Sequence, residues 1–194
     1  GIAKPLYGLG KFEELLVKIA GVQKTEDICL NKKAVVVFCA DNGVVAEGVT
    51  QTDSSVTAVV TENFARGIAS VNRMASVAGA DVIPVDIGVL GEIKEPGVRN
   101  CRIANGTRNM RKEPAMSHEQ VLEAIHTGIT LASELKDAGY DLLAVGEMGI
   151  GNTTTSSAVA SVLLQAPVEL VTGRGAGLSN TGLEKKIEVI KEAI

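Results

Sequence analysis

The segment Ala34–Ala40, with the sequence AVVVFCA, is an uninterrupted apolar run rich in β-branched valine. A strand that is apolar on both sides has both faces covered, as strands of parallel sheets do. Two further short runs, Val82–Gly88 and Leu142–Val145, are separated from it and from each other by stretches with helical spacing. This alternation predicts an α/β fold, with a parallel Rossmann-like sheet that carries helices on both faces.

Local signals set the expected element boundaries. Helices are predicted over Gly10–Ala20, Val56–Phe64 (N-cap Asp53 or Ser54), Ser70–Ala78, Ser117–Gly139, Thr155–Leu164, and from a capping box at Thr181 and Glu184. A second capping box is expected at Ser117 and Gln120. Val168–Val171 is predicted to be a fourth strand and 90–107 a loop. Pro84 removes one ladder donor, so its strand is expected to be irregular or near an edge.

Length and composition narrow the class of protein. The 194 residues are enough for a single domain, expected over 1–194. The net charge is −4 and no basic stripe with aromatics is present, which argues against a nucleic-acid partner. The longest apolar run is too short to cross a bilayer. Three cysteines, Cys29, Cys39 and Cys101, lack metal-ligand spacing and are expected to be reduced thiols of a cytoplasmic protein with no metal or cofactor.

The segment after the third predicted strand, VGEMGIGNTTT at 145–155, carries the strongest functional signal. It is expected to be a turn of bare backbone that opens a helix, where N–H groups and the helix dipole favour an anion. Glu147 lies at the rim of this turn. A simpler interpretation is that glycines only turn the chain. That interpretation explains Gly146, but it explains less well the two later glycines and the polar run behind them. The spacing matches neither a P-loop nor the dinucleotide fingerprint.

Other loops are ambiguous by themselves. The glycine-rich loop at 173–177 is as easily a flexible turn as a site. Lys185 and Lys186 behind it are more simply part of a solvated helical face, although a lysine close to this loop could complete a phosphate site. Asp41-Asn42-Gly43 is either an Asx turn or part of a site, and Asp86 has the same ambiguity. His118 and His126 are expected on a helix away from these loops and receive no catalytic role. Because ligands of parallel sheets sit at the carboxyl ends of the strands, the loops are expected to share one edge.

Taken in order, these motifs resemble those of the nicotinate-nucleotide–dimethylbenzimidazole phosphoribosyltransferase family. Residues 147–154, EMGIGNTT, are similar to its G-E-x-G-x-x-N-T-T signature, and 39–44, CADNGV, to its A-D-H-G-V. KPLYGLG at 4–10, VDIG at 85–88 and GRG at 173–175 also fit. The resemblance implies transfer of phosphoribose from nicotinate mononucleotide to 5,6-dimethylbenzimidazole in cobalamin biosynthesis. Nicotinate is released and α-ribazole 5′-phosphate forms. Family members are dimers, so a homodimer is expected.

The resemblance also implies residue roles. Glu147 would lie beside the ribose and nicotinate, Lys186 would neutralise charge, and 50–60 would form the wall of the base pocket. The substrate-binding residues expected on this basis are Asp41, Asn42, Thr52, Val60, Asp86, Gly149, Gly151, Asn152, Thr153, Thr154, Gly173, Arg174, Gly175 and Lys186. Asn42 replaces the family's usual histidine. Thr52 and Val60 stand where some relatives carry Ser and Gln, an altered wall that would suit a different base.

The resemblance further implies that the sequence is part of a longer protein. The family's catalytic glutamate, the expected general base, belongs to a motif beyond Ile194, and the family's N-terminal helix is missing as well. Two other functions stay open. One is a non-catalytic module that binds a nucleotide or a base. The other is a nicotinamide-dependent oxidoreductase, and the missing dinucleotide fingerprint argues against it.

Overall fold

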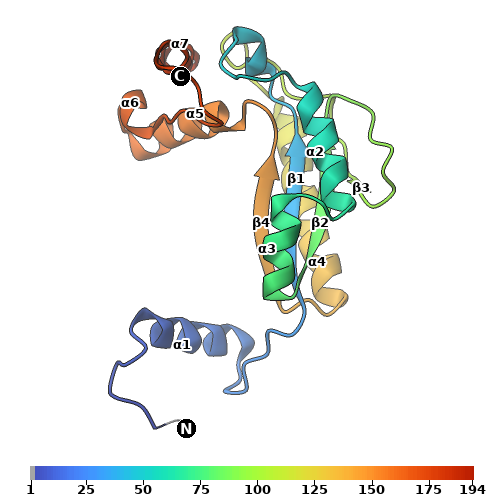
Figure 1. Ribbon diagram of the computed structural model, residues 1–194, viewed down its shortest axis with the longest axis vertical. Coiled ribbons are helices and arrows are strands. Elements are labelled where there is room, and N and C mark those ends of the chain that lie inside the picture. Colours follow the sequence, from blue (N-terminus) through green and yellow to red (C-terminus); the bar gives the residue numbers. More distant parts are fainter. Residues whose placement is uncertain (1–2) are drawn as a thin grey trace.

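A computed structural model describes residues 3–194; the first two residues of the domain expected over 1–194 lie outside that range. In chain order the elements are α1 (Lys11–Gln23), β1 (Lys33–Ala40), η1 (Gly43–Glu47), α2 (Ser55–Ala65), α3 (Ser70–Ala78), β2 (Ala80–Gly88), β3 (Arg99–Asn100), α4 (His118–Asp137), β4 (Leu142–Met148), α5 (Asn152–Leu164), α6 (Val168–Val171) and α7 (Asn180–Ala193) (Figure 1).

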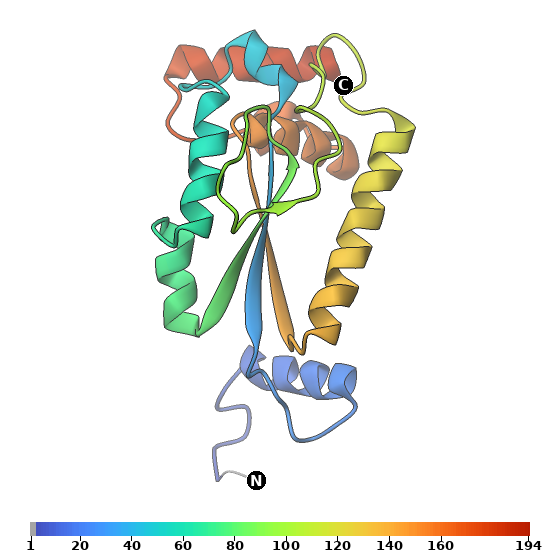
Figure 2. The same cartoon turned by 90° about the vertical axis from the view of Figure 1, so that its right-hand side faces the viewer.

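The four strands form one parallel sheet in the order β3-β2-β1-β4. Its central strand β1 pairs along its length with β2 on one side and with β4 on the other. Helices α2 and α3 lie along one face and α4 along the other (Figure 2). The predicted α/β fold, a parallel sheet with helices on both faces, is confirmed.

The core is divided between the two faces of β1, because alternate side chains of a strand point to opposite sides. Val36 packs with Val85 and the α4 residues Leu131 and Leu135. On the other face Val37 and Cys39 pack with Val89. Each such side chain contributes roughly 1.5–3 kcal/mol through burial. The apolar run at 34–40 is therefore continuous because both of its faces are covered.

Several local signals are confirmed. Helix α3 spans Ser70–Ala78, as predicted. At the start of α4, the Ser117 N–H donates to Gln120 Oε1 (2.9 Å), and the Gln120 N–H donates to Ser117 Oγ (3.2 Å). Pro84 lies near an edge, since β3 pairs only with Val85 and Asp86 of β2.

Two predictions in the C-terminal third are wrong: the type of one element and the first residue of one helix. Val168–Val171 is the short helix α6 and not a fourth strand. Pro167 precedes it with φ −53°, and only Val168 is buried, against Ala158 of α5 and Ile190 of α7. Helix α7 begins after Ser179, whose Oγ accepts from the Gly182 N–H (3.1 Å), so the expected capping box at 181–184 does not form. The two-residue strand β3 lies in a segment predicted to be loop, because two residues give no periodicity to detect.

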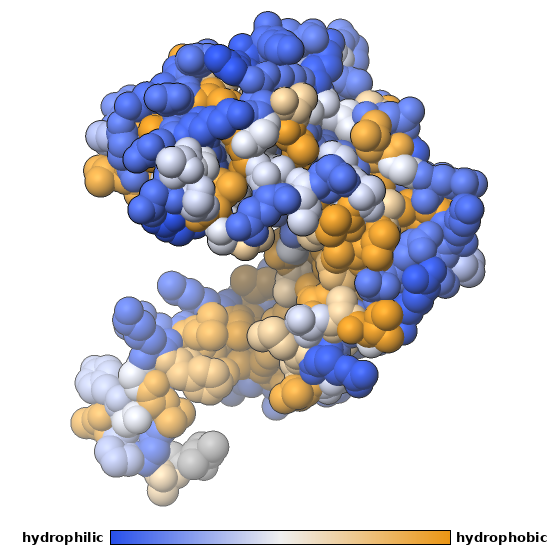
Figure 3. Space-filling model, turned by 45° about the horizontal axis from the view of Figure 1, so that its top comes forward, coloured by the Kyte–Doolittle hydropathy of each residue, from blue (hydrophilic) through white to orange (hydrophobic). Residues whose placement is uncertain are grey.

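Strand β4 is an edge strand that pairs only with β1 in the part of the chain that the structure describes, and most of its side chains are exposed. Its Val145, which points to the same face of the sheet as Val36, is 76% exposed, and helices α5–α7 gather beyond the carboxyl ends of the strands instead of covering it (Figure 1). Helix α1 stands apart near the opposite end and exposes Phe12, Leu15 and Val22. Apolar side chains are prominent on this arm and on the adjoining body (Figure 3). None of the described helices is both long and apolar enough to cross a membrane.

The three cysteines are unpaired. Cys39 lies in the core, where burial raises the pKa of its thiol to about 11. It is therefore protonated at neutral pH and has packing as its role.

Candidate functional site

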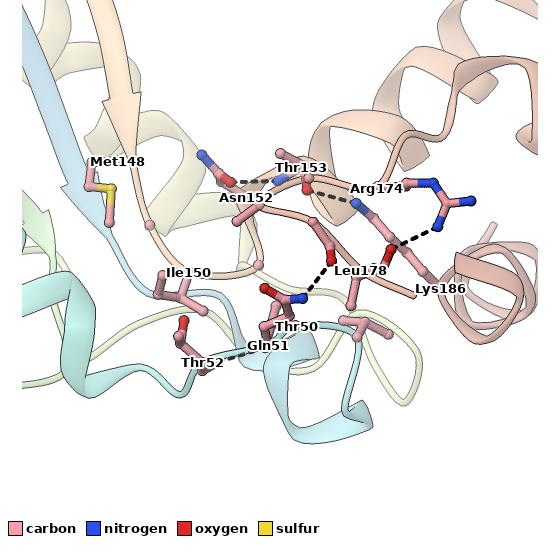
Figure 4. A pocket seen from close by; sticks show the side chains of 16 residues that line it. Thr50, Gln51, Thr52, Met148, Ile150, Asn152, Thr153, Arg174, Leu178 and Lys186 are labelled. Carbon is pink, nitrogen blue, oxygen red and sulfur yellow. Dashed lines mark hydrogen bonds between the residues drawn. The ribbon is translucent and has the colours of Figure 1, made fainter. Parts of the chain in front are cut away.

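A cavity of about 290 Å³ lies at the carboxyl ends of β1 and β4. Three segments distant in sequence form it together with Lys186 of α7: 49–52 after β1, 148–153 from the last residue of β4 onward, and 174–178 before α7 (Figure 4). Gln51 crosses between two of them, with its Nε2 donating to the Gly177 carbonyl (2.5 Å). The predicted residues that line the cavity are Thr52, Gly149, Gly151, Asn152, Thr153, Arg174, Gly175 and Lys186. Loops distant in sequence thus meet at the carboxyl ends of the strands, as expected.

Lys186 is the most distinctive residue of this cavity. Its side chain extends from α7, and the residue is only 1% exposed. Nζ donates to Thr153 Oγ1 (2.7 Å) and to the Gly173 carbonyl (3.0 Å). An ammonium group has three donors, so one remains. The simpler interpretation of Lys186 as part of a solvated face is wrong, whereas Lys185 is exposed.

The cavity has a cationic lining. Arg174 and Lys186 are its only charged residues, and neither has an ion-pair partner within residues 3–194. Arg174 is held by the Leu178 carbonyl (2.8 Å) and by Asn180 Oδ1. Burial lowers the pKa of Lys186, because desolvation penalises its charged form. An anionic ligand would offset that penalty.

The glycines of the turn after β4 have a steric explanation. A Cβ on Gly149 would stand 1.9 Å from the Ala40 carbonyl oxygen. Gly151 has φ +89°, and a Cβ there would stand 2.8 Å from Val45 Cγ2. Close packing therefore requires Gly149 at the end of β1 and Gly151 against η1, whereas a Cβ on Gly146 would meet only Val37 Cγ2 at 3.9 Å. The interpretation that Gly146 turns the chain is wrong, because Gly146 lies inside β4.

Most N–H groups at the start of α5 already have acceptors. The Asn152 N–H donates to the Gly149 carbonyl and the Thr154 N–H to the Gly151 carbonyl (3.0 Å each). The Thr153 N–H donates to Asn152 Oδ1 (2.7 Å). Within residues 3–194 the Gly151 N–H has no acceptor. The Gly151 N–H is therefore an unpartnered donor on a residue that lines the cavity, as Lys186 and Arg174 also do. Thr154 is buried and does not line the cavity.

Glu147 lies on β4, just outside the cavity lining. Its Oε1 accepts from Nδ2 of Asn152, which does line the cavity. Partial burial raises the pKa of Glu147, and the Asn152 hydrogen bond opposes that rise. The carboxylate is thus one hydrogen bond away from the cavity.

Three other residues that were predicted to bind substrate do not line the cavity. Asp41 is buried, and its Oδ2 accepts from the Leu90 N–H (2.8 Å). Asp86 accepts from the Val89 N–H (2.8 Å) and forms an ion pair with Arg102 (2.8 Å). Val60 of α2 does not reach the cavity. Asp86 forms an Asx turn, with its Oδ1 accepting from the Gly88 N–H (3.1 Å), whereas Asp41 joins the end of β1 to the loop after β2.

Asn42 also lies outside the lining, but it contacts the turn directly. Its Nδ2 donates to the Ile150 carbonyl (3.1 Å). The Ile150 N–H donates in turn to Oγ1 of Thr57, a fully buried residue of α2 to which sequence reasoning gave no individual role (3.1 Å). The signal for Thr57 is the pair of hydroxyls at Thr57 and Thr61, four residues apart in an otherwise apolar stretch. Within residues 3–194 no cluster of three metal-ligating side chains is present.

Comparison with known proteins gives concordant results. A family model described as "Phosphoribosyltransferase" matches residues 1–194. The nicotinate-nucleotide–dimethylbenzimidazole phosphoribosyltransferases of Acetivibrio thermocellus and Ruminiclostridium cellulolyticum are 46% and 48% identical over 193 residues. These matches cover 100% of this chain and 55% of each relative, so the chain spans about half the length of these curated relatives. The crystal structure of CobT from Thermus thermophilus is similar, with a TM-score of 0.93 and 39% identity over 98% of this chain and 58% of that one.

Proposed function

The chain belongs to the phosphoribosyltransferase family whose model matches it throughout, and on that premise we propose that its cavity binds the phosphoribosyl end of nicotinate mononucleotide. In the full-length protein the phosphoribose is then transferred to 5,6-dimethylbenzimidazole or a related base. The products are nicotinate and α-ribazole 5′-phosphate, as part of cobalamin biosynthesis. The names of the relatives support this proposal.

Buried Lys186 is the observation that carries the proposal. A lysine that is 1% exposed and has no carboxylate partner within residues 3–194 is costly unless an anion joins it. A phosphate would receive hydrogen bonds from the third donor of Nζ, from the Gly151 N–H and from Arg174. Charge-assisted hydrogen bonds of this kind are about twice as strong as neutral ones.

The transfer breaks the bond between the ribosyl carbon and the nicotinate nitrogen, and it forms a bond from that carbon to a nitrogen of the base. Nicotinate departs from a cationic pyridinium and keeps the bonding electron pair, so its departure needs no general acid. Positive charge develops on the ribosyl carbon, and the Glu147 carboxylate would stabilise it. The acceptor nitrogen loses its proton to a general base expected outside residues 1–194.

The test is incubation of the full-length protein with nicotinate mononucleotide and dimethylbenzimidazole, followed by measurement of released nicotinate. We expect release that depends on the base. Absence of release with dimethylbenzimidazole and with every related acceptor would contradict the proposed activity.

A second candidate applies to residues 1–194 alone: a module that binds the nucleotide without catalysing transfer. It is favoured by the cavity lining, which includes no carboxylate and no histidine to accept the acceptor's proton. Calorimetry on this chain would then show binding of nicotinate mononucleotide, while no nicotinate appears in the presence of the base. Release of nicotinate by this chain would rule the module out.

We also propose that the protein is a cytoplasmic homodimer. The three unpaired cysteines suit a reducing compartment. The exposed apolar side chains of α1 and β4 suit contact with further protein surface. Light scattering on the full-length protein would test the oligomeric state.

A further inference from the structure

The residue Ile150, between the two constrained glycines of the turn after β4, is held from both sides. Its N–H donates to Thr57 Oγ1 on α2 (3.1 Å), and its carbonyl accepts from Asn42 Nδ2 at the end of β1 (3.1 Å). The Asn42 amide is itself oriented, because its Oδ1 accepts from Thr155 Oγ1 (3.0 Å). Side chains from two separate elements therefore fix consecutive peptide units of one loop.

These two hydrogen bonds determine which way the neighbouring polar groups point. In a trans peptide unit the carbonyl and the N–H point in opposite directions. Holding the Ile150 carbonyl on Asn42 therefore aims the Gly151 N–H, which belongs to the same peptide unit, away from Asn42. Holding the Ile150 N–H on Thr57 likewise aims the Gly149 carbonyl toward the start of α5, where it accepts from the Asn152 N–H (3.0 Å).

The peptide group that these contacts orient includes the N–H of Gly151. This glycine lines the cavity, and its N–H has no acceptor within residues 3–194. Glycine backbone rotates readily, so a turn with glycine on both sides of Ile150 would not hold that N–H in one direction unaided. Asn42 is suited to the task because a short amide offers a donor and an acceptor at once.

We propose that Asn42 and Thr57 are positioning residues that aim the Gly151 N–H into the cavity, where it donates to the phosphate of the substrate. Asn42 thus acts through the loop and does not touch the ligand. The identity of the anion rests on the proposed function. Thr57 also joins the loop after β4 to the first residues of α2, which belong to the stretch 50–60 expected to form the wall of the base pocket.

Matched variants separate positioning from general stability. Thr57→Val and Asn42→Leu remove the hydrogen bonds with little change in volume. Thr57→Ser keeps the hydroxyl, and Asn42→His, studied at about pH 8, keeps one donor and one acceptor in its neutral form. Thr61→Val is the control, because Thr61 is equally buried on α2 but its hydroxyl donates to the Thr57 carbonyl (2.7 Å) and makes no hydrogen bond to residues 149–152.

Two measurements are made on each variant: affinity for inorganic phosphate and nicotinate mononucleotide by calorimetry, and amide hydrogen exchange of residues 149–152. We expect Thr57→Val and Asn42→Leu to weaken binding on the order of 10- to 100-fold. In Thr57→Val the Ile150 amide should also lose its protection from exchange. Thr57→Ser and Asn42→His should restore most of the affinity, and Thr61→Val should bind as the unsubstituted protein does.

The positioning role is overturned if Thr57→Val and Asn42→Leu bind both ligands normally and leave exchange of the loop amides unchanged. It is also overturned if Thr61→Val causes the same losses, since the effect would then be general destabilisation of α2. If the unsubstituted protein binds neither ligand, the proposed function fails. In that case, faster hydrogen exchange of the Ile150 amide in Thr57→Val than in the unsubstituted protein would still show that Thr57 holds the loop, and equal exchange would show that it does not.

Discussion

Lys186 is a residue whose burial is costly for folding and whose charge we propose serves anion binding. Its ammonium is buried beside the Thr153 hydroxyl and the Gly173 carbonyl, and no carboxylate of residues 3–194 forms an ion pair with it. Its pKa is lower in the folded than in the unfolded chain, so folding disfavours the charged form. This penalty is fully present below the folded-state pKa and is relieved as the pH rises toward the unfolded-state value. A bound phosphate reverses the balance by favouring the ammonium.

The variant Lys186→Met tests this account, because methionine has a similar length and no charge. We expect its free energy of unfolding to equal or exceed that of the unsubstituted chain, while affinity for phosphate falls on the order of 10- to 100-fold. Urea unfolding and calorimetry measure the two quantities. Unchanged affinity would show that Lys186 has no part in anion binding.

Glu147 makes a prediction about pH. Its pKa is raised by partial burial, so protonation sets in at a higher pH than for an ordinary glutamate. If the carboxylate stabilises the ribosyl cation, kcat of the full-length protein falls as the pH drops through this raised pKa. Glu147→Gln should lower kcat by roughly 100-fold and remove that acidic limb. A profile of kcat from about pH 5 to 8 provides the measurement. If Glu147→Gln leaves the pH profile of kcat unchanged, Glu147 takes no part in the reaction.

At the scale of elements, the signals that succeeded are local or depend on burial of a whole face. The strand β1 was predictable from AVVVFCA because both of its sides are covered, and α4 from its capping box. Val168–Val171 misled because Val-Glu-Leu-Val suits a strand, whereas Pro167 and packing on α5 and α7 make it a helical turn. Strand propensity reflects packing context more than backbone preference.

The site was predictable only in outline. The gathering of three loops at one sheet edge follows from parallel topology. The contacts of Ile150 with Thr57 and Asn42 join residues 93 and 108 positions apart, and no local pattern specifies them. Asn42, Asp41 and Asp86 carry polar groups suited to a ligand, but the structure uses those groups to brace loops.

The start of α7 supplies a prediction for one element, because two hydroxyl residues compete for the cap. Ser179 accepts from the Gly182 N–H, whereas Thr181 lies within the helix. Ser179→Ala should lower the free energy of unfolding by about 1 kcal/mol. Thr181→Ala should lower it clearly less. Urea titrations of the two variants measure the difference, and the reverse order would place the cap at Thr181.

At the scale of the molecule, the uncovered edge strand β4 is the main irregularity. The chain spans about half the length of its curated relatives, and the side chain of Val145, on a face of this strand, is 76% exposed. Exposed strand edges and apolar patches promote association. We therefore expect residues 1–194 alone to self-associate with rising concentration. Val145→Lys should reduce this association, whereas Ser156→Lys, which adds the same charge to an exposed position on α5, should not. Light scattering would show the contrast, and a concentration-independent monomer would contradict it.

We expect the cavity around Lys186 to bind the phosphate of nicotinate mononucleotide. Residues 1–194 are titrated with this nucleotide and, separately, with the riboside that lacks the phosphate. The nucleotide should bind at least about tenfold more tightly, and Lys186→Met should remove most of this difference. Equal affinity for the two compounds, or a difference that survives in Lys186→Met, would contradict this expectation.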